Sequence, residues 1–101
     1  MYKIKNSKEL ASLINCINLN NMISEEEMEE YLDKVGELNF NSITISPTYV
    51  SLAKEKLADS TTKISTVVGF PLGFETTEGK VAQAAKALKD GADEIEAVIN
   101  L

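Results

Sequence analysis

The chain alternates between short apolar runs and longer stretches in which apolar residues recur every three or four positions. The short runs are typical of buried strands, and the recurring positions are typical of amphipathic helices. Strands are predicted at about residues 13–19, 42–45, 64–70 and 95–101. Because the strands recur at roughly 25 to 30 residues with a helix between them, we expect consecutive parallel βα units.

Two helices are predicted in the first half of the chain. Ser7 can cap a short leading helix at about residues 7–13, which carries Leu10. Ser24, followed three residues later by Glu27, forms a capping box that starts the next helix, and Asn39 ends it. The apolar face of that second helix comprises Met28, Tyr31, Leu32, Val35 and Leu38.

Two further helices follow the second and third strands. Pro47 suits the first turn of one helix, whose apolar face is formed by Val50, Ala53 and Leu57. Thr76 can cap the other helix, and Gly91 is its C-terminal stop. Its apolar positions are Val81, Ala84, Ala85 and Leu88.

Residues 67–78 combine the end of a strand, a Gly/Pro turn and the start of a helix. Pro71 lacks a backbone donor and favours an extended Phe70, so the strand should stop there. Gly69 and Gly73 allow a sharp turn or a close approach of the backbone to a ligand. The segment is therefore either an ordinary strand-to-helix connection or part of a binding site.

Composition limits the class of protein. The 101 residues are 44% hydrophobic, which suits one small domain or part of a larger one. We expect no transmembrane segment and no signal peptide, because no apolar run is long enough. The single cysteine, Cys16, excludes an internal disulfide and favours the cytoplasm.

Two absent residue types limit the chemistry. The chain has no histidine, which excludes an imidazole base and a histidine-ligated metal site. All ten basic residues are lysines, so no guanidinium can clamp a phosphate. The net charge of −6 disfavours nucleic acid and acidic membranes as partners.

Several segments together resemble the first half of deoxyribose-phosphate aldolase, a class I aldolase built on a TIM barrel. In chain order they are S-P-T-Y-V, G-F-P-L-G, T-T-E, G-A-D-E-I and V-I-N. The resemblance covers residues 10–101. It implies an α/β fold of the TIM (β/α)8 class, with residues 1–101 forming a half barrel of about four strands and three helices after the leading helix.

The resemblance also implies what the complete enzyme does. It cleaves 2-deoxy-D-ribose 5-phosphate into glyceraldehyde 3-phosphate and acetaldehyde through a Schiff base on a lysine, without a metal or cofactor. In the family that lysine, its lysine neighbour and most phosphate-binding loops lie on later strands. Within this chain we expect Lys63 at the amino end of the third strand, on the wrong side of the barrel, and Lys80 solvated in the first turn of the helix after that strand. We therefore expect this chain to be inactive alone, as a truncated, split or excised half that needs a complementary half barrel or forms a homo-oligomer.

Site residues follow from the matching positions of the family. Catalytic groups of TIM barrels lie at the carboxyl ends of strands, which we expect here at residues 15–17, 44–46, 69–73 and 96–100. Glu96 stands where the family has the aspartate of its proton relay, although a structural pairing of Glu96 with a lysine is the alternative. Asn15 and Ile17 replace the aspartate and threonine of the family's I-D-H-T motif, which hold the substrate. Thr44 and Ser46 stand where cysteine and asparagine are common, so the expected substrate-binding residues are Asn15, Ile17, Thr44 and Ser46.

Three functions remain open at this point. The first is the N-terminal half of a deoxyribose-phosphate aldolase. The second is a non-catalytic half-barrel scaffold or binding protein of the same descent, which the changes at Asn15, Ile17 and Glu96 favour. The third is a related Schiff-base aldolase that acts on another sugar phosphate.

Overall fold

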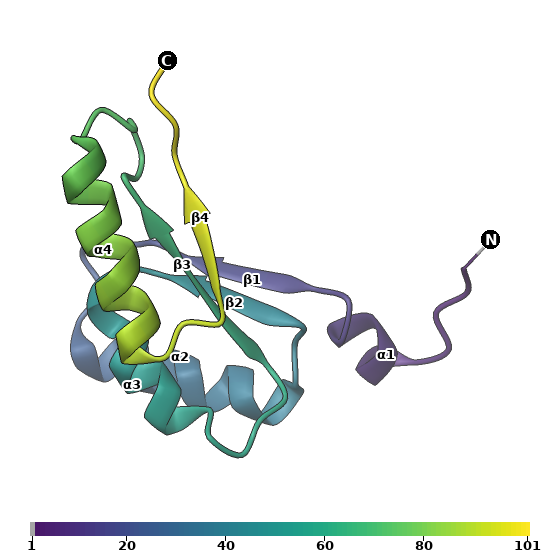
Figure 1. The fold of residues 1–101 in the computed structure, drawn as a ribbon. Helices are drawn as coiled ribbons and strands as arrows, with labels where there is room; N and C mark the ends of the chain where they lie inside the picture. The colour runs from purple at the N-terminus through teal and green to yellow at the C-terminus, as the bar shows by residue number, and fades with distance from the viewer. Residues whose placement is uncertain (1) are drawn as a thin grey trace.

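A computed structural model describes residues 2–101 as a parallel four-stranded sheet with three helices packed on one face (Figure 1). The strands lie in the order β1-β2-β3-β4, and every neighbouring pair is parallel, which confirms the predicted βα units. The elements are α1 (Ser7–Ala11), β1 (Asn15–Asn18), α2 (Glu25–Leu38), β2 (Ser42–Ile45), η1 (Pro47–Tyr49), α3 (Val50–Lys56), β3 (Lys63–Val68), α4 (Thr77–Asp90) and β4 (Glu94–Ala97).

The register of the strands gives the sheet two different faces. Successive side chains of a strand point to opposite faces, so paired positions in neighbouring strands share a face. The outer face, which packs on the helices, carries Cys16, Ile43, Ile45, Ile64 and Ile95. The inner face carries Asn15, Ile17, Ser42, Thr44, Ser65, Val67, Glu94 and Glu96.

The hydrophobic core lies between the outer face and the helices. Met28 and Leu32 of α2 are completely buried, as are Ile43 and Ile45 of β2. The apolar face predicted for α3 is buried against the same cluster. It comprises Val50, Ala53 and, directly after the helix, Leu57. The three βα units therefore complete this side of the sheet with their own residues.

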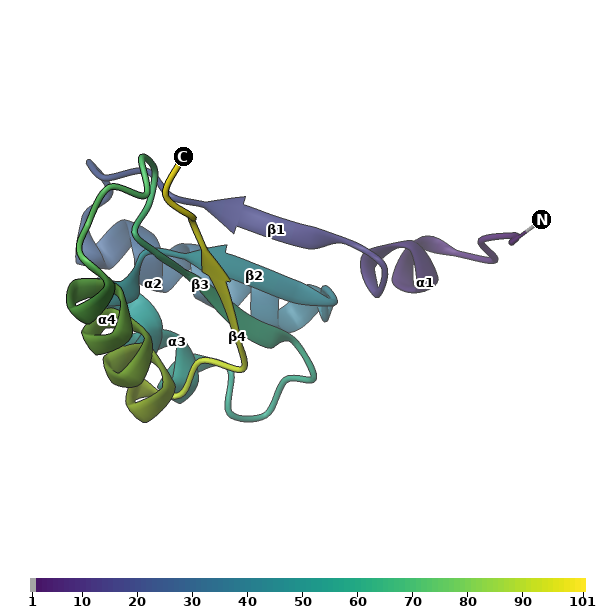
Figure 2. The same ribbon diagram turned by 45° about the horizontal axis from the view of Figure 1, so that its top comes forward.

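The inner face has no covering layer in the described residues (Figure 2). β1 and β4 form the two edges of the sheet, and their inner side chains are exposed, with Ile17 at 63%. β2 is buried at every position and β3 at all but its first, whereas β1 and β4 are exposed at every inner position. Four parallel strands with helices on one side form half of a closed barrel.

The leading helix α1 projects away from the sheet beyond the amino end of β1 (Figures 1 and 2). Its N-cap is Asn6, whose side chain accepts a hydrogen bond from the Glu9 amide at 2.9 Å, so the prediction of Ser7 as the cap was wrong. The helix ends at Ala11 and buries no residue. An extended backbone at Asn6 places a better acceptor one residue earlier.

Two strands are shorter than predicted. β3 ends at Val68 rather than Phe70, because Gly69 has a φ of 69° and leaves the extended conformation. β4 covers Glu94–Ala97 rather than residues 95–101. Beyond it the Val98 amide still donates to the Val68 carbonyl oxygen at 2.9 Å.

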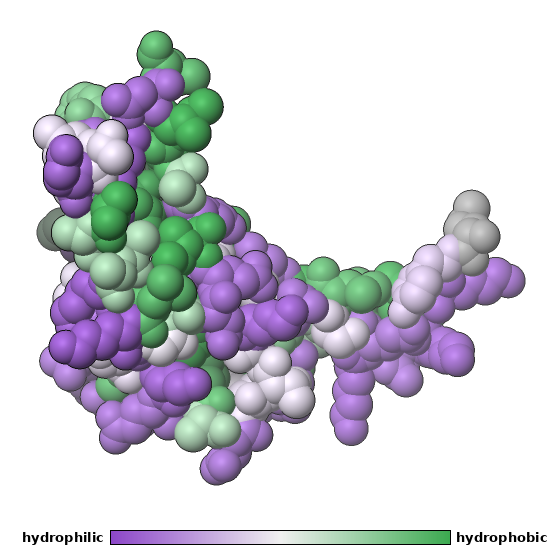
Figure 3. All heavy atoms as spheres, viewed as in Figure 1, coloured by the Kyte–Doolittle hydropathy of each residue, from purple (hydrophilic) through white to green (hydrophobic). Residues whose placement is uncertain are grey.

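The helix caps agree with the sequence, whereas the buried face of α4 does not. Ser24 forms the capping box, Thr76 caps α4, and Asn39 and Gly91 end their helices. The apolar residues chosen to mark α4 include Val81 and Leu88, which are 63% and 57% exposed, while Ala87 is buried. Figure 3 shows hydrophobic surface over α4 and the C-terminal segment, and the exposed large hydrophobic residues there include Val81, Leu88 and Ile99.

The small Ala87 allows α4 to pack closely on the sheet, and periodicity alone did not identify this stripe. Between residues 2 and 101, no helix is both long and apolar enough to cross a membrane.

Candidate functional site

A hydrogen-bonded polar row lies on the inner face at β1 and β2. The Asn15 side-chain oxygen accepts hydrogen bonds from Ser42 Oγ at 2.9 Å and from Thr44 Oγ1 at 3.4 Å. Thr44 is completely buried, and Ser42 is nearly so. The structure thus brings two predicted site residues, Asn15 and Thr44, into contact across 29 positions of sequence.

Asn15 lies at the amino end of β1, although it was expected at the carboxyl end. The strand starts there because Ile14 still closes the turn after α1, its amide donating to the Ala11 carbonyl oxygen at 3.0 Å. The register aligns Ile17 with Thr44 across the inner face. The Asn15 amide oxygen is therefore bonded to the neighbouring strand β2, away from the edge where barrel active sites lie.

Ser46 lies immediately after β2 at the carboxyl edge of the sheet, in the N-cap position of η1 but without a capping side-chain hydrogen bond. It lines a cavity of about 270 Å³ together with Asn20, Asn21, Ile23, Thr48 and Tyr49. In the described part of the chain no hydrogen bond joins Ser46 to Asn15 or Thr44. Ser46 therefore belongs to a separate hollow formed by the loops after β1 and β2.

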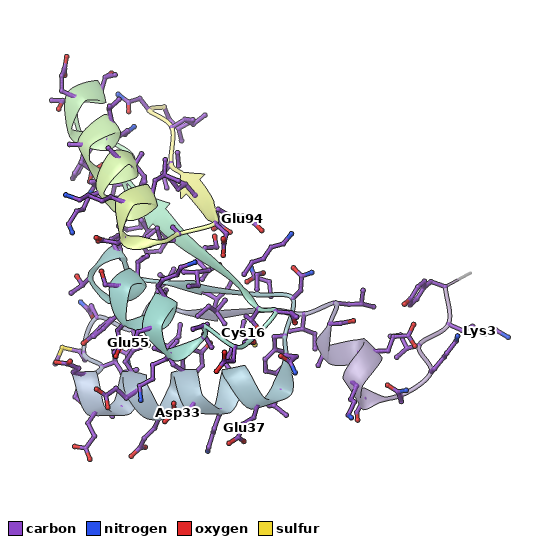
Figure 4. The ribbon with its side chains drawn as sticks, turned by 60° about the horizontal axis from the view of Figure 1, so that its bottom comes forward. Lys3, Cys16, Asp33, Glu37, Glu55 and Glu94 are labelled. Carbon is purple, nitrogen blue, oxygen red and sulfur yellow. The ribbon has the colours of Figure 1, made fainter. Side chains whose placement is uncertain are left out.

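Glu96 lies near the carboxyl end of β4, opposite Val67 of β3 on the inner face. Its side chain is exposed, and no hydrogen bond or ion pair involves the Glu96 carboxylate among residues 2–101. Glu94 shares this face but stands at the amino end of the strand (Figure 4). The structure gives no lysine partner to Glu96, so the alternative of a structural ion pair has no support within this chain.

The lysines near the strand ends differ in their positions. Lys63 opens β3, at the amino end of the strand as expected. Lys80, in the first turns of α4, was expected to be solvated, but it is part-buried and donates to the Gly73 carbonyl oxygen at 2.6 Å. Its ammonium also contacts the side-chain oxygen of Asn100. This role was missed, although the position of Lys80 just after a Gly/Pro turn and a helix cap was a usable signal.

The loop between β3 and α4 packs against backbone rather than standing free. Gly73 has a φ of 73°, and a Cβ there would lie 2.8 Å from Val98 Cγ1 and clash with the Ile99 carbonyl oxygen. The Gly73 amide donates to the Gly69 carbonyl oxygen at 2.7 Å, and the Phe70–Pro71 peptide bond is cis. The close approach that the glycines permit is therefore made to the segment after β4.

Cys16 faces away from the inner face, between the sheet and α2 (Figure 4). Burial raises the pKa of its thiol, which agrees with a small core residue rather than a nucleophile. Burial, and then the neighbouring Cys16, raise the pKa of Tyr31 to about 12. In the part of the chain that the structure describes, no cluster of three acidic or cysteine side chains could hold a metal ion.

Known proteins resemble the chain in sequence over most of its length. It is 39% identical over 94 residues to a deoxyribose-phosphate aldolase of Caldicellulosiruptor saccharolyticus, covering 93% of this chain and 43% of that protein. It is 41% identical over 93 residues to the deoxyribose-phosphate aldolase of Enterococcus faecalis, covering 92% of this chain and 42% of that protein. The chain thus spans about two-fifths of the length of these curated relatives.

Solved structures resemble it in fold. A crystal structure described as a putative deoxyribose-phosphate aldolase from Coccidioides immitis matches with a TM-score of 0.88 at 26% identity, over 98% of this chain and 39% of that chain. The tetrameric deoxyribose phosphate aldolase of Aeropyrum pernix matches with a TM-score of 0.83 at 30% identity, over 95% and 41%. The four strands are therefore the first half of a TIM barrel, as the sequence predicted.

The family assignment rests on sequence and fold together. The family model described as DeoC/LacD family aldolase matches residues 8–101. That range contains the inner face, the β3–α4 loop and Glu96. The chain belongs to the DeoC/LacD family of aldolases.

Proposed function

We propose that this chain supplies the N-terminal half of a deoxyribose-phosphate aldolase that cleaves 2-deoxy-D-ribose 5-phosphate to glyceraldehyde 3-phosphate and acetaldehyde. The proposal is supported by membership of the family. It is also supported by the Glu96 carboxylate near the carboxyl end of β4, which makes no hydrogen bond or ion pair among residues 2–101. Catalytic groups of TIM barrels come from that edge of the sheet. The single cysteine and the negative charge favour action in the cytoplasm without nucleic acid or membrane partners.

The Schiff-base lysine must come from outside the described residues. Among residues 2–101 the last positions of the strands are Asn18, Ile45, Val68 and Ala97, none of them a lysine. Lys80 is near that edge, but its ammonium acts as a donor to two oxygens. A Schiff-base nucleophile has to direct a lone pair at the substrate carbonyl, whereas the Lys80 nitrogen is held against two oxygens of this chain, so Lys80 does not suit that role.

Within the proposed reaction, Glu96 moves the proton at the carbon next to the imine. Its carboxylate is one methylene longer than the aspartate of the family, and proton transfer depends on hydrogen-bond reach. The proposed substrate contacts are Ile17, Thr44 and Ser46. Asn15 joins them when its amide oxygen accepts a hydrogen bond from a substrate hydroxyl in place of the one from Ser42. A complementary half barrel or a second copy completes the site.

The decisive experiment combines this chain with the missing strands of a family aldolase and measures acetaldehyde release. Glu96→Gln is expected to lower turnover by about a hundredfold or more, the usual loss on removing a general acid–base. Glu94→Gln is the matched control, because Glu94 lies on the same strand and face but at the other end. Unchanged turnover in Glu96→Gln would return Glu96 to a structural role.

The chain alone is expected to trap no substrate. Borohydride reduction in the presence of acetaldehyde, followed by intact-mass measurement, tests this for all ten lysines at once. A stoichiometric adduct on one lysine would contradict the assignment of the nucleophile to the other half.

A second candidate is a non-catalytic half-barrel scaffold, which the Asn15 geometry favours. The Asn15 amide oxygen is already bonded by Ser42 and Thr44, and Ile17 presents an alkyl group where the family has a hydroxyl. A complemented barrel that assembles but releases no acetaldehyde would support this candidate over the enzyme.

A further inference from the structure

Lys80 connects three segments at the carboxyl edge of the sheet. Its side chain starts from α4, its ammonium donates to the Gly73 carbonyl oxygen of the β3–α4 loop at 2.6 Å, and it reaches Asn100 in the segment after β4. The two acceptors are 27 residues apart in sequence. A charged donor makes stronger hydrogen bonds than a neutral one, so this link has more weight than an ordinary loop contact.

The same loop and segment also meet through their backbones. The absence of a side chain at Gly73 lets the loop lie directly against Val98 and the Ile99 carbonyl. The Val98 amide donates to the Val68 carbonyl oxygen at 2.9 Å, immediately before the loop begins. Residues 98–100 are therefore held from two sides, directly after the strand that carries Glu96.

Two further side chains of the first turns of α4 and its approach complete the arrangement. Gln83, one turn after Lys80, accepts a hydrogen bond from the Gly69 amide at 2.9 Å. A Cβ at Gly69 would lie 3.0 Å from Lys80 Cε and 3.1 Å from Glu75 Oε2, a buried oxygen with no hydrogen-bond partner in residues 2–101.

We propose that Lys80 is a positioning residue that fastens the β3–α4 loop (residues 69–76) to the segment following Glu96 (residues 98–101). β4 has only four residues and lies at an edge, so this attachment holds the carboxyl end of the strand where its own ladder stops. The inference rests on the proposed function only for the role of Glu96. The attachment itself is measurable without any activity.

Amide hydrogen exchange on the associated form of the 101-residue chain, or on the complemented barrel, tests the attachment. In Lys80→Met, exchange of the hydrogen-bonded amides of Gly73 and Val98 is expected to rise by at least about tenfold, as for the loss of one charge-assisted hydrogen bond. Lys86→Met is the matched control: Lys86 lies on the same helix, its side chain is 70% exposed, and its ammonium is 2.6 Å from Asp90. Lys80→Arg keeps the charge and donors and is expected to restore most of the protection.

A carbon NMR signal reports on Glu96 itself. The carboxyl resonance of Glu96, assigned by its absence in Glu96→Gln, is expected to shift in Lys80→Met and to return in Lys80→Arg, while the Glu94 resonance stays in place. Unchanged exchange in both segments, or a Glu96 signal that ignores Lys80, would overturn the proposal. Failure of Lys80→Arg to restore protection would also overturn it, because the charge and the hydrogen-bond donors at position 80 would then not be what holds the two segments together.

Asn100→Ala covers the case in which Lys80→Met unfolds the chain. Asn100 is exposed, so its truncation leaves no cavity, and protection of β2 shows that the core persists. Faster exchange of the Val98 amide in this variant supports the attachment, and wild-type exchange there refutes it. An inactive complemented enzyme with the expected exchange pattern would instead count against the proposed function alone.

Discussion

The two faces of the sheet are formed by the same four strands but differ in how their side chains are covered. On the outer face, Ile43 and Ile45 are completely buried under helices that follow each strand in sequence. On the inner face, Ile17 and the two glutamates of β4 are exposed, and the polar row at Asn15 is only partly covered. Each βα unit therefore completes its own outer side, whereas the inner side depends on strands beyond these four.

The two faces therefore differ in what they contribute: the outer face contributes folding free energy, and the inner face carries polar side chains. The outer face is apolar and closely packed, which is the usual source of folding free energy. The inner face carries Thr44, Ser65 and Glu96, groups that are costly to bury without partners. A half barrel can thus contain a well-packed core and still leave its inner face open.

The largest expected effect concerns assembly. The isolated chain should not persist as a well-folded monomer. Unpaired edges at β1 and β4 and an open inner face cost free energy, and the net stability of a folded domain is only about 5 to 15 kcal/mol. Two copies can pair β1 of one with β4 of the other and close eight strands. Size-exclusion chromatography with light scattering tests this, and a monodisperse, cooperatively melting monomer of 11.0 kDa would contradict it.

Truncation of one residue on each face sharpens the contrast. Leu32→Ala removes a completely buried side chain under the outer face and is expected to cost about 2 to 5 kcal/mol at every protein concentration. Ile17→Ala acts on the inner face, so its effect should be small in dilute protein and grow as copies associate. Urea unfolding over a range of protein concentrations measures both. Equal, concentration-independent losses would show that the two faces do not differ in this way.

The two helix caps give a smaller contrast. Ser24 caps α2, which buries Met28 and Leu32, whereas Asn6 caps α1, which buries nothing. Ser24→Ala is therefore expected to lower the free energy of unfolding by about 1 kcal/mol, and Asn6→Ala to leave it nearly unchanged. Thermal melts followed by circular dichroism compare them. A global loss in Asn6→Ala would mean that α1 packs on something in solution.

The smallest expected effect comes from Tyr31. Its buried hydroxyl has no hydrogen-bond partner within residues 2–101, so Tyr31→Phe should leave stability at neutral pH unchanged or slightly higher. Folding raises the pKa of Tyr31 to about 12 from 10.0, chiefly by burial. The folded state therefore keeps a proton that the unfolded state loses, and stability falls as pH rises from about 10 to about 12.

Tyr31→Phe should weaken this alkaline loss. Urea midpoints measured just below and just above pH 10, together with the ultraviolet titration of tyrosinate, provide the test. An alkaline loss identical in both proteins would remove Tyr31 as its cause.

Local features of the chain were predictable from local sequence. The capping box at Ser24, the end of α2 at Asn39 and the strand at Ser42–Ile45 all depend on hydrogen bonds and alternation within a few residues. The motifs around Gly69–Gly73 and Gly91 also sufficed for the family, since they occur in one order at given separations. The N-cap of α1 failed because two adjacent capping residues, Asn6 and Ser7, compete.

Features that depend on distant residues were not predictable. The apolar residues chosen for α4 included the exposed Val81 and Leu88, because periodicity identifies a stripe without saying what covers it. Lys80 was taken as solvated, because its acceptor Asn100 lies on another strand's extension. Asn15 was placed at the wrong end of β1, since the start of the strand is set by its pairing with Ser42.

The sequence by itself determined the order of βα units, most helix boundaries and the family, because these depend on residue type and short-range spacing. Only the tertiary structure decided which side chains share the inner face, which ones bond to each other, and which remain free. The Asn15 side chain accepts a hydrogen bond from Ser42, 27 positions away in sequence. The Glu96 carboxylate, by contrast, makes no hydrogen bond or ion pair among residues 2–101. Strand register, formed by pairing over long separations, produces that difference, and no local pattern contains it.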